Sequence, residues 1–339
     1  MKPVYLPPNQ LHRFYRGGSR IAALRSSGND DPYAPEEWIA STASPFGEPG
    51  AGIGILPDGT PLPDAIAADP EAYLGPAHVG RFGSDIAVLI KLLDAGERLP
   101  VHFHPGDAFA QTHLGSPVGK TEAWIILECS PEAEVHVGFR EEVSSDDVAR
   151  WVEAQDAKSM LAALHRLPVS AGDTIFVPAG TPHAIGDGIL LAELQQPTDF
   201  SVLLEWEGFA VDGPTAGHLG LGFDLALEAL DRSPWSDARL DRATSSRSTQ
   251  GRAGVETLFP LEADSFFRAE RILSERSRLE ASFSVLLVTR GRGCLNGDGW
   301  QVELTRGDAI LVPYGAGPSE IAGSVDVFRC MPPAPETSH

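Results

Sequence analysis

Short apolar runs separated by turn residues are the strongest pattern in the chain. The first three runs are 86–93 (IAVLIKLL), 123–127 (AWIIL) and 173–177 (DTIFV). Runs of this length near Gly, Pro and Asp predict short strands buried in a β-sandwich. A second set repeats the pattern near the end of the chain, at 282–289, 299–304 and 309–312. The sequence therefore predicts a mainly β protein with two groups of strands.

Two regions interrupt this pattern with helical spacing. Residues 144–167 begin with Ser144 and an acidic first turn, and apolar residues then recur every three or four positions. We interpret them as a small helical insertion of two short helices. A weaker helical pattern covers 62–74, in which Asp69 and Pro70 are typical of an N-cap and of the first helical residue.

The two groups of strands share an internal repeat. Residues 172–180 and 307–315 both have the pattern G-D-x-I-x-V-P-x-G, which indicates a duplicated β domain. The copies differ three residues after the pattern, where the first has His183 and the second has Pro318. Whatever His183 does, the second copy cannot do at that position.

The repeat suggests how the chain divides. We expect a first domain over 1–210, a segment of helix and linker over 211–254, and a second, smaller domain over 255–335. Residues 231–254 are polar with few large apolar side chains, so we predict a linker or long loop there.

Charge and cysteine content exclude several classes of partner. The chain has 339 residues, with 26 basic and 47 acidic side chains and a net charge of −21. Such a field repels nucleic acid and anionic lipid, so we expect neither as a partner. Three cysteines form no disulfide framework, and the start of the chain has no apolar leader. We expect a cytoplasmic protein.

Three histidines and one glutamate have the types and spacing of a metal site. His102 and His104 lie two residues apart, so on a strand both imidazoles project from the same face. Glu122 begins the next apolar run, and His183 follows the P-x-G turn. These ligands suit Zn²⁺, and Fe²⁺, Mn²⁺, Co²⁺ or Ni²⁺ would fit the same set. We expect one divalent ion, in the first domain alone.

These motifs resemble those of the cupin superfamily. His102-Phe-His104 and the segment 172–183 match its two conserved motifs, except that 17 residues separate His104 from Glu122. That wider spacing is similar to the type I phosphomannose isomerase family. Further matching pieces are Glu36-Glu37-Trp38, Leu89-Ile-Lys91-Leu-Leu-Asp94, Lys120-Thr-Glu122-Ala-Trp124 and Glu193-Leu-Gln195-Gln196.

The resemblance implies two cupin (jelly-roll) domains and an aldose–ketose isomerase that holds one zinc ion. The substrate would be mannose 6-phosphate, converted to fructose 6-phosphate, or a related sugar. The family's ligand pattern Q-x-H…E…H maps onto His102, His104, Glu122 and His183, with histidine in place of the glutamine. Histidine binds zinc well, so we expect the metal to be retained.

One departure from the family concerns an arginine. The family has an active-site arginine in an S-D-x-x-x-R segment, whereas this chain keeps Asp199 but has Val202 and Leu203 where the arginine would fall. Apolar side chains cannot bind phosphate. Either Arg16, Arg140, Lys91 or another cation reaches the site, or the substrate differs from mannose 6-phosphate.

Isomerisation requires a base with a pKa near 7 and stabilisation of oxyanion charge. We choose Glu193 as the catalytic base, with Lys120 and Glu37 as polar partners in catalysis. A metal-dependent cupin oxygenase and a non-catalytic sugar-binding module remain alternatives. The expected partner is a small sugar or sugar phosphate, and the chain would be a monomer or a homodimer.

Overall fold

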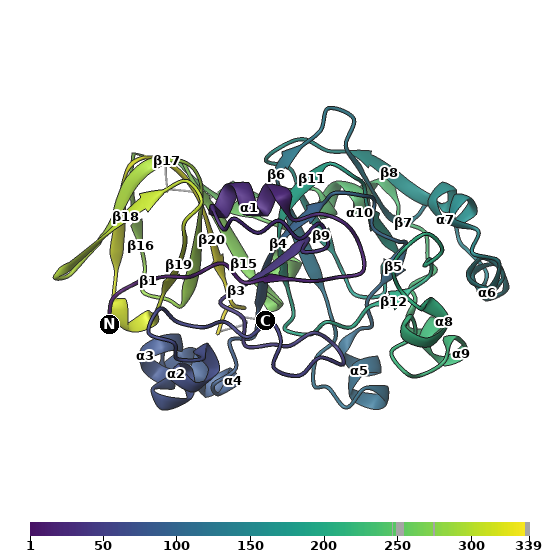
Figure 1. Ribbon diagram of the computed structural model, residues 1–339, viewed down its shortest axis with the longest axis horizontal. Helices are drawn as coiled ribbons and strands as arrows, with labels where there is room; N and C mark the ends of the chain where they lie inside the picture. Colours follow the sequence, from purple (N-terminus) through teal and green to yellow (C-terminus); the bar gives the residue numbers. More distant parts are fainter. Residues whose placement is uncertain (246, 249–253, 274, 336–339) are drawn as a thin grey trace.

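The strands form three antiparallel sheets arranged in two lobes (Figure 1). The structure is a computed structural model that describes residues 1–245, 247–248, 254–273 and 275–335. One lobe contains a six-stranded and a five-stranded sheet, here called the central and outer sheets. The other contains a nine-stranded sheet, here called the distal sheet. The mainly β class predicted from the sequence is confirmed.

The central sheet is buried on both faces. In β4, Ile90 and Leu92 join a core shared with the distal sheet, while Leu93 and Ala95 join the core shared with the outer sheet. Strands buried on both faces read as continuous apolar runs, which explains the run at 86–93. The strand order is β2 (Gln10–Leu11), β3 (Glu36–Ile39), β4 (Leu89–Ala95), β11 (Ile189–Gln195), β6 (Glu122–Cys129) and β9 (Thr174–Val177).

The outer sheet lies between the central sheet and a layer of helices. Val135 and Val137 of β7 face the central sheet, whereas Phe139 packs against Val148 and Met160 of the helices outside. The strand order is β12 (Val202–Leu203), β5 (His102–Phe103), β10 (His183–Ile185), β7 (Glu134–Phe139) and β8 (Leu164–Pro168).

The distal sheet encloses a core of its own and packs its other face on the central sheet. In β17, Leu286 and Val288 face the enclosed core, while Val285 and Leu287 contact the shared one. The strand order is β1 (Val4–Tyr5), β19 (Ala309–Val312), β17 (Ser284–Gly297), β20 (Ser319–Met331), β15 (Arg268–Ile272), β14 (Val255–Leu258) and β13 (Arg247–Ser248), with β16 (Arg276–Leu279) on β20 and β18 (Trp300–Thr305) on β17.

The helices are short. The predicted cap is confirmed, because the side chain of Asp69 accepts a hydrogen bond from the backbone N–H of Ala72. No helix among the described residues is long and apolar enough to cross a membrane. The α-helices are α1 (Ser19–Arg25), α2 (Leu62–Ala68), α3 (Pro70–Leu74), α4 (Pro76–Phe82), α5 (Asp107–His113), α6 (Ser145–Ala154), α7 (Ala157–Ala163), α8 (Gly213–Ala216), α9 (Phe223–Ala226) and α10 (Asp237–Ala243), and the 3-10 turns are η1 (Leu227–Ala229), η2 (Leu261–Ser265) and η3 (Tyr314–Ala316).

The helical insertion ends four residues earlier than the spacing predicts. Helices α6 and α7 form as expected, but the chain turns at Leu164 into strand β8, which pairs with β7. The helix ends there because the following residues pair with strand β7. In β8, Leu164 is buried while His165 and Leu167 are half-buried, so the segment fits a sheet edge better than a third turn of helix.

The prediction of a linker over 231–254 is wrong for its first half. Trp235 is only 3% exposed, and its ring fills the space beside Gly138 of β7. Helix α10 then begins at Asp237, with Ser236 accepting a hydrogen bond from the Arg239 N–H. One buried tryptophan and a capped helix hold this polar segment in place. Residues 246 and 249–253 of the predicted linker lie outside the described residues.

The start of the chain also differs from the predicted division. Residues 4–5 form β1, which pairs with β19 of the distal sheet through Val4 opposite Leu311. The predicted first domain begins at residue 1, yet these first residues complete the other lobe. Two alternating residues are too short a pattern to reveal such a strand from sequence.

The two copies of the repeat adopt the same local structure. Strands β9 and β19 each begin two residues after their glycine and end before their proline. Gly172 and Gly307 both have positive φ angles, of 103° and 94°, a conformation that strains any other residue. A Cβ at Gly307 would also lie 2.0 Å from the carbonyl oxygen of Leu24.

Gly307→Ala should therefore destabilise the protein more than Gly59→Ala, which has a similar φ of 89° but open space around its Cβ. Strain alone should cost about 1 kcal/mol in Gly59→Ala. The backbone clash should raise the cost in Gly307→Ala by a further 1–3 kcal/mol or so. Thermal and urea unfolding of both variants measure the difference, and equal losses of stability would contradict this account.

Candidate active site

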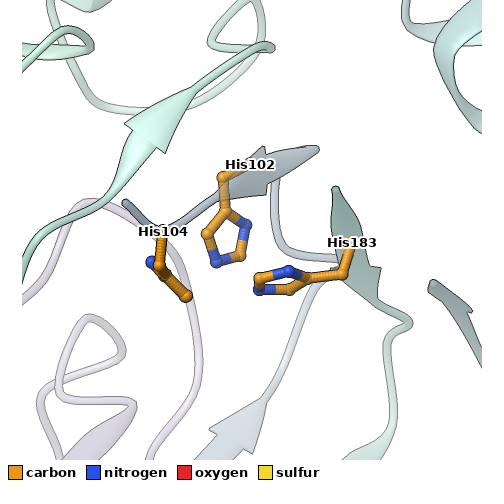
Figure 2. Close-up of side chains that lie close together, drawn as sticks. All are labelled: His102, His104 and His183. Carbon is orange, nitrogen blue, oxygen red and sulfur yellow. The ribbon is translucent and has the colours of Figure 1, made fainter. Parts of the chain in front are cut away.

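The imidazoles of His102, His104 and His183 lie close together (Figure 2). His102 on β5 lies opposite His183 on β10 in the strand register, and His104 follows one residue after β5 ends. Their potential ligand nitrogens lie within 4.8 Å of one another. All three side chains are buried. The H-x-H alternation therefore brings its two imidazoles to one face, as the sequence predicted.

Backbone carbonyls fix the orientation of each imidazole. Each Nδ1 faces a carbonyl oxygen, which accepts hydrogen bonds but cannot donate them, so Nδ1 carries the proton. The Nε2 lone pair then points into the space between the rings. The three contacts are His102 to Pro100 at 2.9 Å, His104 to Phe200 at 2.7 Å and His183 to Thr181 at 2.9 Å.

Glu122 joins this group from the central sheet. Its Oε2 lies 3.0 Å from Nε2 of His104, and its Oε1 lies 3.3 Å from Nε2 of His183. Burial would raise the pKa of Glu122, but Lys120 and His104 hold it well below its usual range. Glu122 is therefore a carboxylate, and the indole N–H of Trp124 donates to it at 2.9 Å.

The facing nitrogens need a cation. Burial lowers the pKa of His104 to about 4 and that of His183 to about 3, so both are neutral at physiological pH. Their Nε2 atoms are buried and have no hydrogen-bond donor in the described chain, yet each faces an oxygen of a carboxylate. Lone pairs this close repel unless a cation lies between them. The arrangement fits a divalent ion held by nitrogen and oxygen ligands.

A cluster of charged side chains extends from this group along the central sheet. It contains three cations and four carboxylates that line the same cavity of about 160 Å³. Lys91 of β4 lies 3.2 Å from Glu36 of β3 and 3.8 Å from Glu193 of β11. The members are Arg13, Lys91, Lys120, Glu36, Glu122, Glu193 and Asp199.

Glu193 is the carboxyl group of this cluster whose pKa is raised toward neutrality. Burial and the negative charge of Glu122 raise its pKa to about 7. Lys91 and Lys120 lie 3.8 and 3.7 Å from its Oε1, which accepts no hydrogen bond in the described chain. A buried carboxyl with a pKa near neutrality, lining a cavity, can both take up and release a proton.

Lys120 remains charged. Burial would lower its pKa, but Glu122 and Glu193 raise it above the usual range. Its Nζ lies 3.0 Å from Oε2 of Glu122. Lys120 therefore acts as a fixed positive charge between the candidate metal ligands and Glu193, and not as a base.

Comparison with known proteins finds relatives named mannose-6-phosphate isomerase. No family model matches the chain. The mannose-6-phosphate isomerase of Streptococcus mutans is 34% identical over 199 residues, which span 58% of this chain and 58% of that protein. Mannose-6-phosphate isomerase ManA of Bacillus subtilis is 28% identical over 71% of this chain and 73% of that protein.

Solved structures show the same fold. The mannose 6-phosphate isomerase of Bacillus subtilis superposes with a TM-score of 0.79 at 23% identity, over 97% of this chain and 99% of that one. A zinc-bound mannose 6-phosphate isomerase superposes with a TM-score of 0.75 at 16% identity, over 98% and 100% of the two chains.

The chain is thus similar to proteins named mannose-6-phosphate isomerase, and it spans 58% of the length of the Streptococcus mutans relative. Its fold is the mainly β, cupin fold that the resemblance implied.

For one predicted site residue, the structure requires a correction. Glu37 was expected beside the catalytic base, but it points away from the cavity and pairs with Arg25 at 2.8 Å. Its neighbour Glu36 lines the cavity instead and accepts from the Tyr15 hydroxyl at 2.5 Å. Successive side chains of β3 face opposite sides of the sheet, so only one of the two glutamates can reach the site.

Two of the proposed substitutes for the family's arginine are also outside the cavity. Arg16 is at the surface beside Tyr33, and Arg140 lines a separate depression near α6. Lys91 does line the cavity, and so does Arg13, which no sequence pattern singled out. Arg13 follows β2 in an irregular segment whose path no periodic pattern predicts.

Val202 and Leu203, where the family's arginine would fall, face different parts of the molecule. Val202 is fully buried in the core beneath the helices outside the outer sheet. Leu203 lies opposite His102 in the strand register, and its side chain lines the cavity. An apolar side chain therefore occupies the place beside His102 that the resemblance assigns to a cation.

His183→Ala should lose the metal ion, whereas His113→Ala, in an exposed part of α5, should keep it. The reason is that His183 supplies one of the three imidazole nitrogens that could bind the ion, and alanine removes it. Elemental analysis of protein purified without chelator or affinity tag should give near one divalent ion per chain for the wild type and the control. Two ions per chain, or an unchanged content in His183→Ala, would contradict the site.

Proposed function

We propose that this protein is a metal-dependent aldose–ketose isomerase that acts on mannose 6-phosphate or a related sugar. The observation that carries the proposal is that a candidate metal site and a carboxyl with a pKa near 7 line one cavity. The relatives named mannose-6-phosphate isomerase support the reaction class. A sugar or sugar phosphate would be the small-molecule partner.

The candidate metal ligands are His102, His104, Glu122 and His183, and zinc is the ion we expect. Support comes from the donor set and from the zinc bound in one of the structural neighbours. Zinc would supply a Lewis acid that polarises the hydroxyl and carbonyl oxygens at the two reacting carbons. Trp124 holds Glu122, and the backbone carbonyls hold the imidazoles, so the ligands are oriented before the ion binds.

Glu193 is the proposed catalytic base. Isomerisation moves one proton between adjacent carbons, so a single carboxylate can remove it from one carbon and return it to the other. The pKa of about 7 makes both directions accessible. Burial on β11 keeps bulk water from the oxygen that would carry the proton.

Lys120 is the proposed electrostatic partner of Glu193. As a fixed ammonium 3.7 Å from that carboxylate, it can donate to a sugar oxygen on which negative charge develops. It also favours the ionised form of Glu193, which is the form that acts as a base. Glu37 is not assigned a catalytic part, because its side chain lies on the other face of β3.

The proposal includes a cytoplasmic location and a monomeric or homodimeric state. The three cysteines are free, which suits the reducing cytoplasm. The net charge of −21 argues against nucleic acid and anionic membrane as partners. The protein would act as a monomer or a homodimer.

Glu193→Gln should lower kcat by about 10²- to 10⁴-fold, because an amide cannot take up the proton. The metal content should remain near one ion per chain, since Glu193 is not a proposed ligand. Glu153→Gln, on the exposed side of α6, is the matched control and should keep full activity. A Glu193→Gln variant that retains wild-type kcat would remove Glu193 from the mechanism.

The activity should rise with pH along an acid limb. Below its pKa Glu193 is protonated and cannot act as a base, so kcat/KM should fall as the pH drops below about 7. A divalent ion on the imidazoles would add positive charge and lower the pKa of Glu193, which places the midpoint at or below that value. A profile of kcat/KM between pH 5 and 9 checks this, and an activity that increases toward low pH would contradict it.

A further inference from the structure

One wall of the cavity is apolar. The charged side chains come mainly from the central sheet, whereas the apolar wall is built by the loop that precedes β5, by β12 and by the chain that follows β12. Leu203 of that wall lies opposite His102 in the strand register, so the apolar surface begins beside the candidate metal ligands. The residues of the wall are Leu99, Leu203, Val211, Ala216 and Leu219.

Each cation that lines the cavity is already paired with two or more carboxylates. Arg13 lies 3.3 Å from Glu36 and 2.9 Å from Asp199. Lys91 approaches the same two carboxylates, at 3.2 and 3.5 Å, and also contacts Glu193.

Lys120 is paired in the same way, with Glu122 at 3.0 Å and Glu193 at 3.7 Å. Three cations against four carboxylates give the lining a formal charge of 3 − 4 = −1. A divalent ion would bring the sum to +1, but its charge would lie among the imidazoles, where the reacting oxygens bind. The apolar wall itself, as far as the described residues show it, would still contribute no positive charge.

A phosphate ester would fit this cavity poorly. It carries a charge between about −1.5 and −2 at neutral pH, and placing it against leucine and valine side chains would remove its hydration without a compensating partner. Recruiting Arg13 would break an existing buried ion pair. The chain's net charge of −21 also repels an approaching dianion.

We infer that the cavity takes a sugar that is uncharged at C6, the end far from the reacting carbons. Such a sugar would be an unphosphorylated hexose or a 6-deoxyhexose, in which C6 is a methyl group. The polar half of the cavity would bind the reacting oxygens at C1 and C2, and the apolar wall would contact the opposite end. The inference rests on the proposed function and selects among the sugars that it includes.

The test compares zinc-loaded wild-type protein on D-mannose, 6-deoxymannose and mannose 6-phosphate, by kcat/KM and by titration calorimetry. We expect one of the two uncharged sugars to equal or exceed the phosphate ester in both measurements. A tenfold or larger preference for mannose 6-phosphate would overturn the inference while supporting the proposed isomerase. If no sugar is converted, the proposed isomerase activity is wrong, and calorimetry then tests the inference by itself. Tighter binding of an uncharged sugar would support the inference. Tighter binding of the phosphate ester, or no binding of any sugar, would overturn it.

A substitution in the apolar wall tests the inference independently. Leu203→Arg should raise the ratio of kcat/KM for mannose 6-phosphate to that for mannose by roughly 10- to 100-fold, the worth of one charge-assisted contact. Leu261→Arg, at a site that is 67% exposed on η2, adds the same charge elsewhere and should leave the ratio unchanged. Metal content reports whether the site is intact, and Leu219→Arg replaces Leu203→Arg if that variant loses its ion. An unchanged ratio in a metal-loaded wall variant would contradict the placement of the sugar's far end.

Discussion

The site depends on hydrogen bonds from three imidazole Nδ1 atoms to backbone carbonyls. A carbonyl fixes the tautomer of the ring that faces it, so each Nε2 is left with a lone pair directed at its neighbours. Burial keeps these rings neutral, and Glu122 adds a carboxylate to the same space. The folded backbone therefore concentrates electron pairs at one buried point, which is stable only when a cation is bound there.

The layered fold explains how one cavity combines different chemistries. The outer sheet contributes His102, His183 and part of the apolar wall, and the central sheet contributes most of the charged groups, Glu122 among them. Because the other face of the central sheet is covered by the distal sheet, its strands are held from both sides. The distal sheet repeats the strand and turn of the metal-binding lobe, but has Pro318 where the first has His183. Its observed contribution is packing.

The sequence was most informative where a pattern has a local geometric meaning. The H-x-H alternation predicts that two imidazoles share one face of a strand, and the repeated G-D-x-I-x-V-P-x-G segment predicts a strand that ends at its proline. The structure agrees with both. It was least informative in β3, where all four residues are buried, so that alternation could not tell Glu36 from Glu37. Arg13 escaped notice because its position depends on how an irregular segment crosses the sheet. Trp235 shows the same limit, since its burial depends on the space above Gly138.

The central claim is that the imidazoles and Glu122 converge on one divalent ion. X-ray absorption at the zinc edge of the loaded protein tests it most directly, because the spectrum reports the ligand atoms around the ion. The account predicts several imidazole nitrogens at about 2.0–2.1 Å together with carboxylate oxygen, and no sulfur. Sulfur ligation, or a shell of oxygens with no imidazole, would show that the ion binds elsewhere and would contradict it.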